Sequence, residues 1–103
     1  MKIVAVTACA AGVAHTFMAA EAIENAAKVK GHEIKVETQG AIGIDNRITE
    51  DEVKNADAVI LTTDITIRER ERFKGKKIFN VSSTACIKSA DKIILTIEEK
   101  ING

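Results

Sequence analysis

Short apolar runs alternate with segments of helical periodicity along the chain, and this alternation constrains the fold more than any other feature. The strand-like runs are residues 2–7, 33–38, 57–63 and 76–81. The first, third and fourth contain continuous apolar stretches, which are typical of strands buried on both faces of a parallel sheet. The second alternates apolar with polar side chains, as an edge strand does. The pattern predicts an α/β fold.

Helical segments fill the stretches between these runs. Residues 14–30 place apolar side chains on one face at helical spacing. Residues 49–52 form a capping box, which predicts a short helix, and residues 66–69 form a second box whose helix would end at Gly75. The last helix is expected to begin at Ser89. Every predicted strand is therefore followed by a helix.

Right-handed crossovers leave few topologies for such a chain. The one we predict is a single domain spanning residues 1–103, built on a doubly wound parallel four-stranded sheet in the order 2-1-3-4, with helices on both faces. A chain of 103 residues has room for one core. In this fold ligands bind beyond the carboxyl ends of the strands, where the winding direction reverses. That crevice would place the loop after residue 7 beside Asp64.

Composition excludes several function classes. Fifteen basic residues balance fifteen acidic ones, and the chain has no Trp, no Tyr and three Phe. Neither an excess of positive charge nor an aromatic surface for stacking bases is present, so nucleic acid is not an expected partner. No stretch is long enough to span a bilayer, so direct membrane insertion is not expected either. Two cysteines make no disulfide framework, which favours a cytoplasmic protein with reduced thiols.

The candidate chemistry lies in residues 7–16. Cys9 comes directly after the first predicted strand, five small or apolar residues follow, and His15 and Thr16 fall in the first turn of the next helix. A helix start carries partial positive charge and unpartnered N–H groups, which stabilise a thiolate and would hold the oxygens of a phosphate attached to it. Cys9 is thus a candidate phosphate carrier. The expected phosphate-binding residues are Ala10, Ala11, Gly12, Val13, Ala14, His15 and Thr16.

Other polar residues are assigned by their place in the predicted sheet. Residues 37–40 close the second strand beside the first, where they would line the crevice, with ordinary turn chemistry as the alternative. Residues 68–72 are expected to be a solvated helix face, His32 a solvated turn residue at the opposite end of the sheet, and Cys86 a packing residue. The possible contacts to a partner protein are Glu37, Gln39, Gly40 and Asp64.

Residues 9–21 resemble the phosphorylation-site segment of the fructose-family enzyme IIB domains. These domains belong to the bacterial phosphoenolpyruvate-dependent sugar phosphotransferase system. The resemblance extends to residues 37–40, 42–44 and 72–76, and so covers most of the chain. It differs at two positions, because Ala10 and Ala11 stand where the family usually has Pro and Thr.

The resemblance implies a role for Cys9 in group transfer. Cys9 would accept a phosphoryl group from a phosphohistidine on a IIA protein. It would then pass that group to a sugar, fructose by default, bound in a membrane-embedded IIC permease. The protein would act at the inner face of the membrane through that permease. Neither a metal nor another cofactor is implied.

Two alternatives remain open from the residues alone. The spacing Cys9-x5-His15-Thr16 is similar to the Cys-x5-Arg-Ser/Thr motif of low-molecular-weight tyrosine phosphatases and arsenate reductases. Those enzymes need the arginine, and the phosphatases an Asp-Pro loop, whereas this chain has His15 and no proline. A regulatory domain with a carrier-like fold is the second alternative. A dinucleotide site would need Gly-x-Gly-x-x-Gly, and a zinc site would need a ligand spacing that is absent from the sequence.

Overall fold

The computed structural model describes residues 1–10, 12–41 and 43–102. One sheet has the strand order β3-β2-β1-β4-β5. Its strands are β1 (Lys2–Thr7), β2 (Glu33–Gly40), β3 (Gly43–Asp45), β4 (Ala58–Thr62) and β5 (Ile78–Val81). The helices are α1 (Val13–Val29), α2 (Glu50–Asn55), the 3-10 helix η1 (Arg70–Phe73) and α3 (Ser83–Asn102). β1 lies in the middle, parallel to both β2 and β4.

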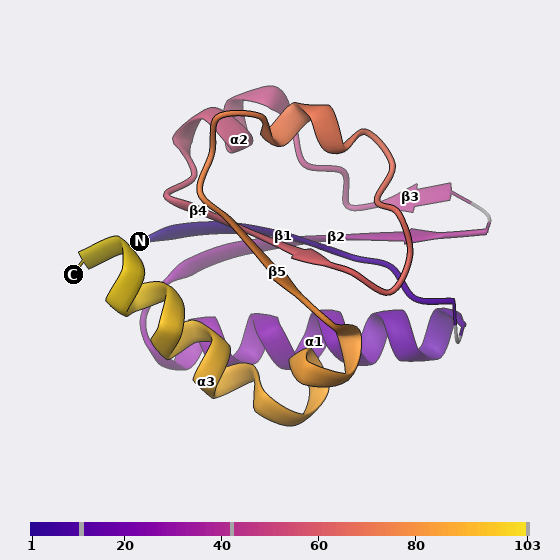
Figure 1. The fold of residues 1–103 in the computed structure, drawn as a ribbon, viewed down its shortest axis with the longest axis horizontal. Coiled ribbons are helices and arrows are strands. Elements are labelled where there is room, and N and C mark those ends of the chain that lie inside the picture. The colour runs from indigo at the N-terminus through magenta and orange to yellow at the C-terminus, as the bar shows by residue number, and fades with distance from the viewer. Residues whose placement is uncertain (11, 42, 103) are drawn as a thin grey trace.

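Helices cover both faces of the sheet. α1 and α3 pack side by side on one face, and α2 with η1 covers the other (Figure 1). Consecutive residues of β1 enter opposite cores because side chains alternate along a strand: Ile3 and Ala5 pack with α1 and α3, while Val4 and Val6 pack with Val53 and Phe73. The predicted doubly wound architecture is confirmed.

The four predicted strands and their relative order are confirmed, but the predicted strand count is wrong. A fifth strand, β3, runs antiparallel to β2, with Thr38 opposite Asp45 and Gly40 opposite Gly43. Gly43, the first residue of β3, has a φ of +134° that suits glycine and few other residues. A strand of three residues is too short to show periodicity. β2 is consequently an edge strand only over its first half.

Of the two predicted capping boxes, the first is confirmed and the second is wrong. Thr49 and Glu52 exchange the expected pair of bonds at the start of α2. In the described chain, residues 66–75 hold only the 3-10 helix η1, preceded by Glu69 at a left-handed φ of 57°. The side chain of Glu69 pairs with Arg47 instead of capping a helix. Tertiary contacts thus override the local signal at residues 66–69.

The last helix begins earlier than predicted. α3 starts at Ser83, and Ser89, the predicted start, is an interruption with φ −138° and ψ 34°. The sequence pattern did not predict the helical residues 83–88 that precede this kink. The earlier start brings Ser83 to the carboxyl edge of the sheet, directly after β5.

His32 lies at the opposite end of the sheet, as predicted, but it is not a solvated turn residue. Its side chain is 11% exposed, and its Nε2 lies 2.6 Å from Oε2 of Glu98 in α3. Its Nδ1 lies 3.1 Å from the amino group of Met1. The ring ties the turn before β2 to the last helix.

Among the residues described, no helix is long and apolar enough to cross a membrane.

Candidate functional site

Cys9 lies two residues beyond the end of the central strand β1, in a loop that side chains of neighbouring elements hold in place. The hydroxyl of Thr62, at the end of β4, accepts from the Ala8 N–H at 3.0 Å and donates to the Ala8 carbonyl at 3.1 Å. The hydroxyl of Thr7 donates to the carbonyl of Thr16 in α1 at 3.2 Å. Thr7, Ala8 and Thr62 are all buried. The segment that leads from β1 to Cys9 is therefore bound to both β4 and α1.

Replacing Thr62 with valine is expected to destabilise the fold by about 1–3 kcal/mol, because both backbone groups of Ala8 would remain buried without this partner. Valine has nearly the same shape, so packing changes little. Urea unfolding of the variant at neutral pH measures the loss. The exposed Thr63, which donates to the Val81 carbonyl, provides a neighbouring control. An equal effect of Thr63→Val would contradict the assignment of the loss to the buried Ala8 groups.

The loop closes at the start of α1. Gly12 is the N-cap residue, and its φ of 126° with ψ of 174° is a combination that essentially only glycine adopts. Its N–H donates to the Cys9 carbonyl at 3.4 Å, and the first helical bond runs from Thr16 N–H to the Gly12 carbonyl. The N–H groups of Val13, Ala14 and His15 therefore have no acceptor within the helix. These donors lie at the end of α1 that follows the Cys9 loop.

The predicted phosphate-binding residues differ in what they can offer. Ala10 and Val13 are exposed and line a hollow with Cys9. Thr16 is buried, and its hydroxyl donates to the Gly12 carbonyl at 3.2 Å, so this proton is engaged within the loop. Ala11 lies outside the described residues. Backbone groups and His15 are consequently the available donors.

Three polar side chains surround the partly exposed sulfur of Cys9. His15 Nδ1 lies 3.0 Å from Cys9 Sγ, Ser83 Oγ lies 3.4 Å from it, and Asp64 Oδ2 lies 4.0 Å away. They come from α1, the start of α3 and the loop after β4. Ser83 was missed in the sequence because the first turn of α3 was missed. Its place directly after the last strand was the one signal that could have found it.

Asp64 is held by Ser83 on both of its carboxylate oxygens. The Ser83 N–H donates to Oδ1 at 2.7 Å, and the Ser83 hydroxyl lies 2.8 Å from Oδ2. Partial burial acts to raise the pKa of Asp64, but these hydrogen bonds and the nearby His15 outweigh it, so the pKa lies below its ordinary value. Asp64 is therefore a carboxylate at neutral pH.

The expected partner contacts divide into buried and accessible residues. Glu37 is fully buried and binds Arg72, so the predicted contact between its side chain and a partner is wrong. Gln39 is 3% exposed and is bound to the backbone N–H and carbonyl of Arg68. Gly40 and Asp64 are accessible at the carboxyl edge.

The prediction of a solvated charged helix at residues 68–72 is also wrong at Arg72. Its side chain is only 10% exposed and forms two bonds to Glu37, at 2.8 and 2.9 Å. Gln39 and Arg72 together hold residues 68–69 against the end of β2. Gln39 and Arg68 line a hollow of about 340 Å³ next to Cys9, together with Ile65 and Thr66.

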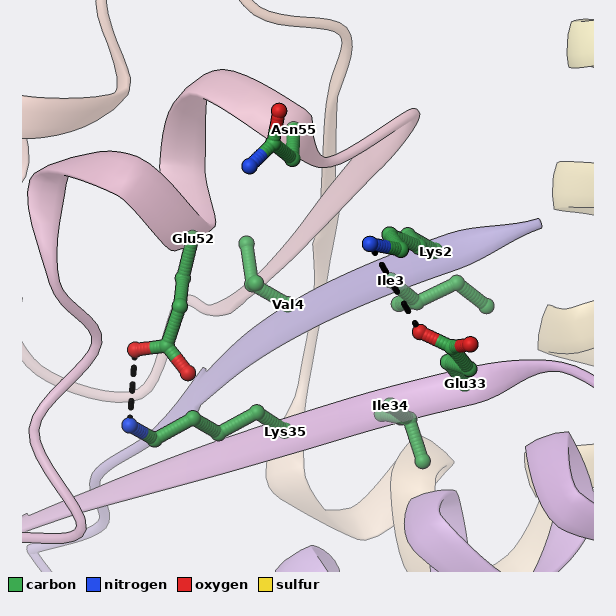
Figure 2. Close-up of a pocket in the computed structure, with 8 residues that line it drawn as sticks. All are labelled: Lys2, Ile3, Val4, Glu33, Ile34, Lys35, Glu52 and Asn55. Atoms are coloured by element: carbon green, nitrogen blue, oxygen red, sulfur yellow. Dashed lines mark hydrogen bonds and ion pairs between the residues drawn. The ribbon is translucent and has the colours of Figure 1, made fainter.

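A second hollow, of about 200 Å³, lies at the other end of β1 and β2 (Figure 2). Its charged side chains neutralise one another, because Lys35 pairs with Glu52 at 2.7 Å and Lys2 lies 3.8 Å from Glu33. Nothing in this arrangement selects a ligand. Among the described residues, no group of three acidic, His or Cys side chains is arranged to hold a metal ion.

The surroundings of Cys9 suit a sulfur that accepts and releases an electrophilic group. The sulfur is accessible, a ring nitrogen lies within bonding distance, and the helix start offers backbone donors for anionic oxygens. Cys86, in contrast, is buried in the core between the sheet and α3. Cys9 is thus the cysteine placed for reaction.

Comparison with known proteins decides the family. The family described as "PTS system, Lactose/Cellobiose specific IIB subunit" matches residues 4–96. The chain belongs to the PTS IIB family. Among its relatives, the PTS system fructose-like EIIB component 2 of Escherichia coli K12 is 59% identical over 97 residues, covering 94% of this chain and 92% of that protein. The predicted family, that of the fructose-family IIB domains, is confirmed.

Solved structures agree with this placement. The enzyme IIB subunit of the PTS system from Escherichia coli K12 has a TM-score of 0.92 at 44% identity, covering 98% of this chain and 94% of that one. A domain of the fructose-specific IIABC component from Borrelia burgdorferi has a TM-score of 0.88 at 53% identity, with coverage of 95% and 93%. A thioredoxin-dependent arsenate reductase from Corynebacterium glutamicum reaches a TM-score of 0.55 at 13% identity, which shows a shared fold alone.

Proposed function

We propose that this IIB chain carries a phosphoryl group on Cys9, taking it from a phosphohistidine of a IIA protein and passing it to a fructose-like sugar bound by a IIC permease. The observation that carries the proposal is the accessible Cys9 sulfur, 3.0 Å from His15 Nδ1 at the start of α1. Residues 1–103 act as one carrier domain. The domain works at the cytoplasmic face of the membrane, where it docks on the permease.

Each transfer breaks one bond to phosphorus and forms another. In the first, the Cys9 thiolate attacks the phosphorus of the donor phosphohistidine in line, the S–P bond forms, and the P–N bond breaks to release the histidine ring of the IIA protein. In the second, a sugar hydroxyl attacks the same phosphorus, its proton passes to a base of the permease, and the S–P bond breaks. Cys9 returns to the thiolate.

The loop stabilises the charge that the phosphoryl group brings. The backbone N–H groups of Val13, Ala14 and His15, with the His15 ring, hold the phosphoryl oxygens, as donors at a helix start do. Ala10 offers only its backbone. His15 takes the position at which phosphatases place an arginine, so the site lacks the bidentate clamp that speeds hydrolysis. The thiophosphate therefore persists long enough for transfer.

The test is to incubate the protein with a phosphorylated IIA protein and to locate the new phosphate by mass spectrometry. We expect the phosphate on Cys9, and we expect its loss on addition of membranes that contain the IIC permease and sugar. Phosphate on another residue, or none, would refute the proposal. Rapid release of inorganic phosphate from an aryl phosphate would favour a phosphatase instead.

A further inference from the structure

Ser83 joins Asp64 to the reacting sulfur and the histidine beside it. Its hydroxyl oxygen lies 2.8 Å from Asp64 Oδ2, 3.3 Å from His15 Nδ1 and 3.4 Å from Cys9 Sγ. Ser83 is fully buried at the start of α3, and its N–H donates to the other oxygen of the same carboxylate at 2.7 Å. Ser83 therefore binds Asp64 through both its backbone and its hydroxyl.

The single proton of the Ser83 hydroxyl belongs to Asp64. The contact to Asp64 Oδ2 is the shortest of the three, and a carboxylate is the strongest acceptor among these groups. The lowered pKa of Asp64 keeps it ionised, so it cannot donate in return. With its proton turned toward Asp64, the Ser83 oxygen presents only lone pairs to His15 and Cys9.

His15 Nδ1 consequently faces two acceptors. The Ser83 oxygen lies 3.3 Å from it, and the Cys9 sulfur, which is an acceptor in its thiolate form, lies 3.0 Å from it. A bare nitrogen lone pair between two acceptors is unfavourable, whereas an N–H satisfies both. We propose that Ser83 and Asp64 are positioning residues that keep the proton of His15 on Nδ1, where it faces the Cys9 sulfur. This inference rests on the proposed role of Cys9 as phosphoryl acceptor.

Direct attraction between Asp64 and Cys9 is limited to the protonated sulfur, whose thiol donates to Asp64 Oδ2 at 4.0 Å. Once Cys9 is a thiolate or carries a phosphoryl group, the charge of Asp64 repels it. Any benefit from Asp64 must therefore pass through Ser83 and His15. A fixed Nδ1–H serves every state of the carrier, because it donates first to the thiolate and then to the oxygens of the attached phosphate.

The decisive variant is Asp64→Asn, which keeps the shape of the side chain and reverses the direction of its hydrogen bond to the Ser83 hydroxyl. An asparagine can still accept from the Ser83 N–H, but its amide nitrogen would donate to the Ser83 oxygen. The Ser83 proton would then turn toward His15 Nδ1 and displace the proton of the ring to Nε2. The expected result is an inverted tautomer with an unchanged fold.

Nitrogen-15 NMR of the histidine ring measures the tautomer directly, on the unphosphorylated protein at a pH where the ring is neutral. We expect Nδ1–H in the native protein, Nε2–H in Asp64→Asn, and loss of the exclusive Nδ1–H form in Ser83→Ala. Ser82→Ala is the matched control, since Ser82 caps the same helix start through Ala85 and should leave the tautomer unchanged. The same tautomer in the native protein and Asp64→Asn, or Nε2–H in the native protein, would overturn the inference.

A second readout links the tautomer to transfer. The rate constant for phosphorylation by a saturating IIA protein should fall by about 10–100-fold in Asp64→Asn, the loss typical when a group that orients an active side chain is removed. The KM for the IIA protein should stay near its native value. Ser83→Thr keeps the hydroxyl that Ser83→Ala removes, so this variant should retain the Nδ1–H form. Because the NMR measurement needs neither partner nor phosphate, a failure of the phosphocarrier proposal would remain distinct from a failure of this one.

Discussion

Replacing Cys9 with serine is expected to lower the rate of phosphoryl acceptance from a IIA protein by several orders of magnitude. A serine hydroxyl is almost entirely protonated at neutral pH and is a weak nucleophile without an adjacent base, whereas cysteine sulfur is intrinsically a much stronger nucleophile. His15 and the backbone donors stay in place in this variant. The measurement is transfer of radioactive phosphate from the phosphorylated IIA protein. A rate within a few-fold of the native value would contradict the role of Cys9.

The second cysteine provides the matched control. Burial, with a smaller contribution from the charge of Asp64, raises the pKa of Cys86 to about 11, so this thiol is neutral and inaccessible at neutral pH. Cys86→Ala should retain phosphoryl acceptance. Iodoacetamide should label Cys9 in the folded native protein and reach Cys86 only on unfolding. Labelling of Cys86 in the folded state would show that the core around α3 opens.

Replacing Arg72 with methionine is expected to destabilise the protein by about 3–5 kcal/mol at neutral pH, the range found when one partner of a buried ion pair is removed. Glu37 is fully buried, and Arg72 gives it two bonds while also bonding the carbonyls of Ile48 and Glu69. Without Arg72, the carboxylate keeps its burial and loses its cation. Urea unfolding at pH 7 measures the loss.

The effect of Arg72→Met should depend on pH. Burial acts to raise the pKa of Glu37, but hydrogen bonds from Arg72, Gln39 and the Ile48 N–H, with the charge of Arg72, hold the pKa below its ordinary value. The stability contributed by Glu37 is therefore fully present above the unfolded pKa of about 4.3 and is lost as the pH falls through the lower folded value. In the variant the pKa of Glu37 rises, so the deficit should narrow toward pH 4.

Two further variants test whether buried charge causes the deficit. Glu37→Gln combined with Arg72→Met removes both charges and should recover part of the lost stability, whereas Arg47→Met breaks only the exposed pair with Glu69 and should cost much less. A deficit in Arg72→Met that stays constant from pH 7 to pH 4, or an equal deficit in Arg47→Met, would point to lost packing instead. Methionine keeps an unbranched aliphatic stem but loses the guanidinium group that lies over the Phe73 ring, 4.8 Å from its centroid.

Local sequence determined the parallel core of the fold. The continuous apolar runs of β1 and β4 are buried in the parallel sheet as predicted, whereas β5 is a partly exposed edge strand, so the prediction of burial on both faces is wrong there. Right-handed crossovers then selected the observed strand order. The same reasoning placed Cys9 between the central strand and a helix start, where its chemistry was evident from principle. These features depend on residues that are neighbours in the chain, which is why patterns in the sequence reveal them.

Contacts between segments distant in sequence decided which charged and polar side chains are buried. Glu37 and Arg72, 35 residues apart, become a buried pair only when β2 and η1 meet, and this pairing overrode both the expected partner contact and the expected solvated helix. His32 likewise meets Glu98 across 66 residues. Such pairs have no local signal, because each residue alone reads as an ordinary surface charge or turn.

The Cys9 loop shows the same division between local sequence and tertiary structure. The sequence by itself determined that Cys9 follows a buried strand, with small residues and His15 behind it, since strand and helix periodicity set that spacing. Only the tertiary structure brought Asp64 and Ser83, from two other carboxyl ends of the sheet, to the same sulfur. The physical reason is that parallel strands deliver residues remote in sequence to one edge, where charge and hydrogen bonding join them into a site.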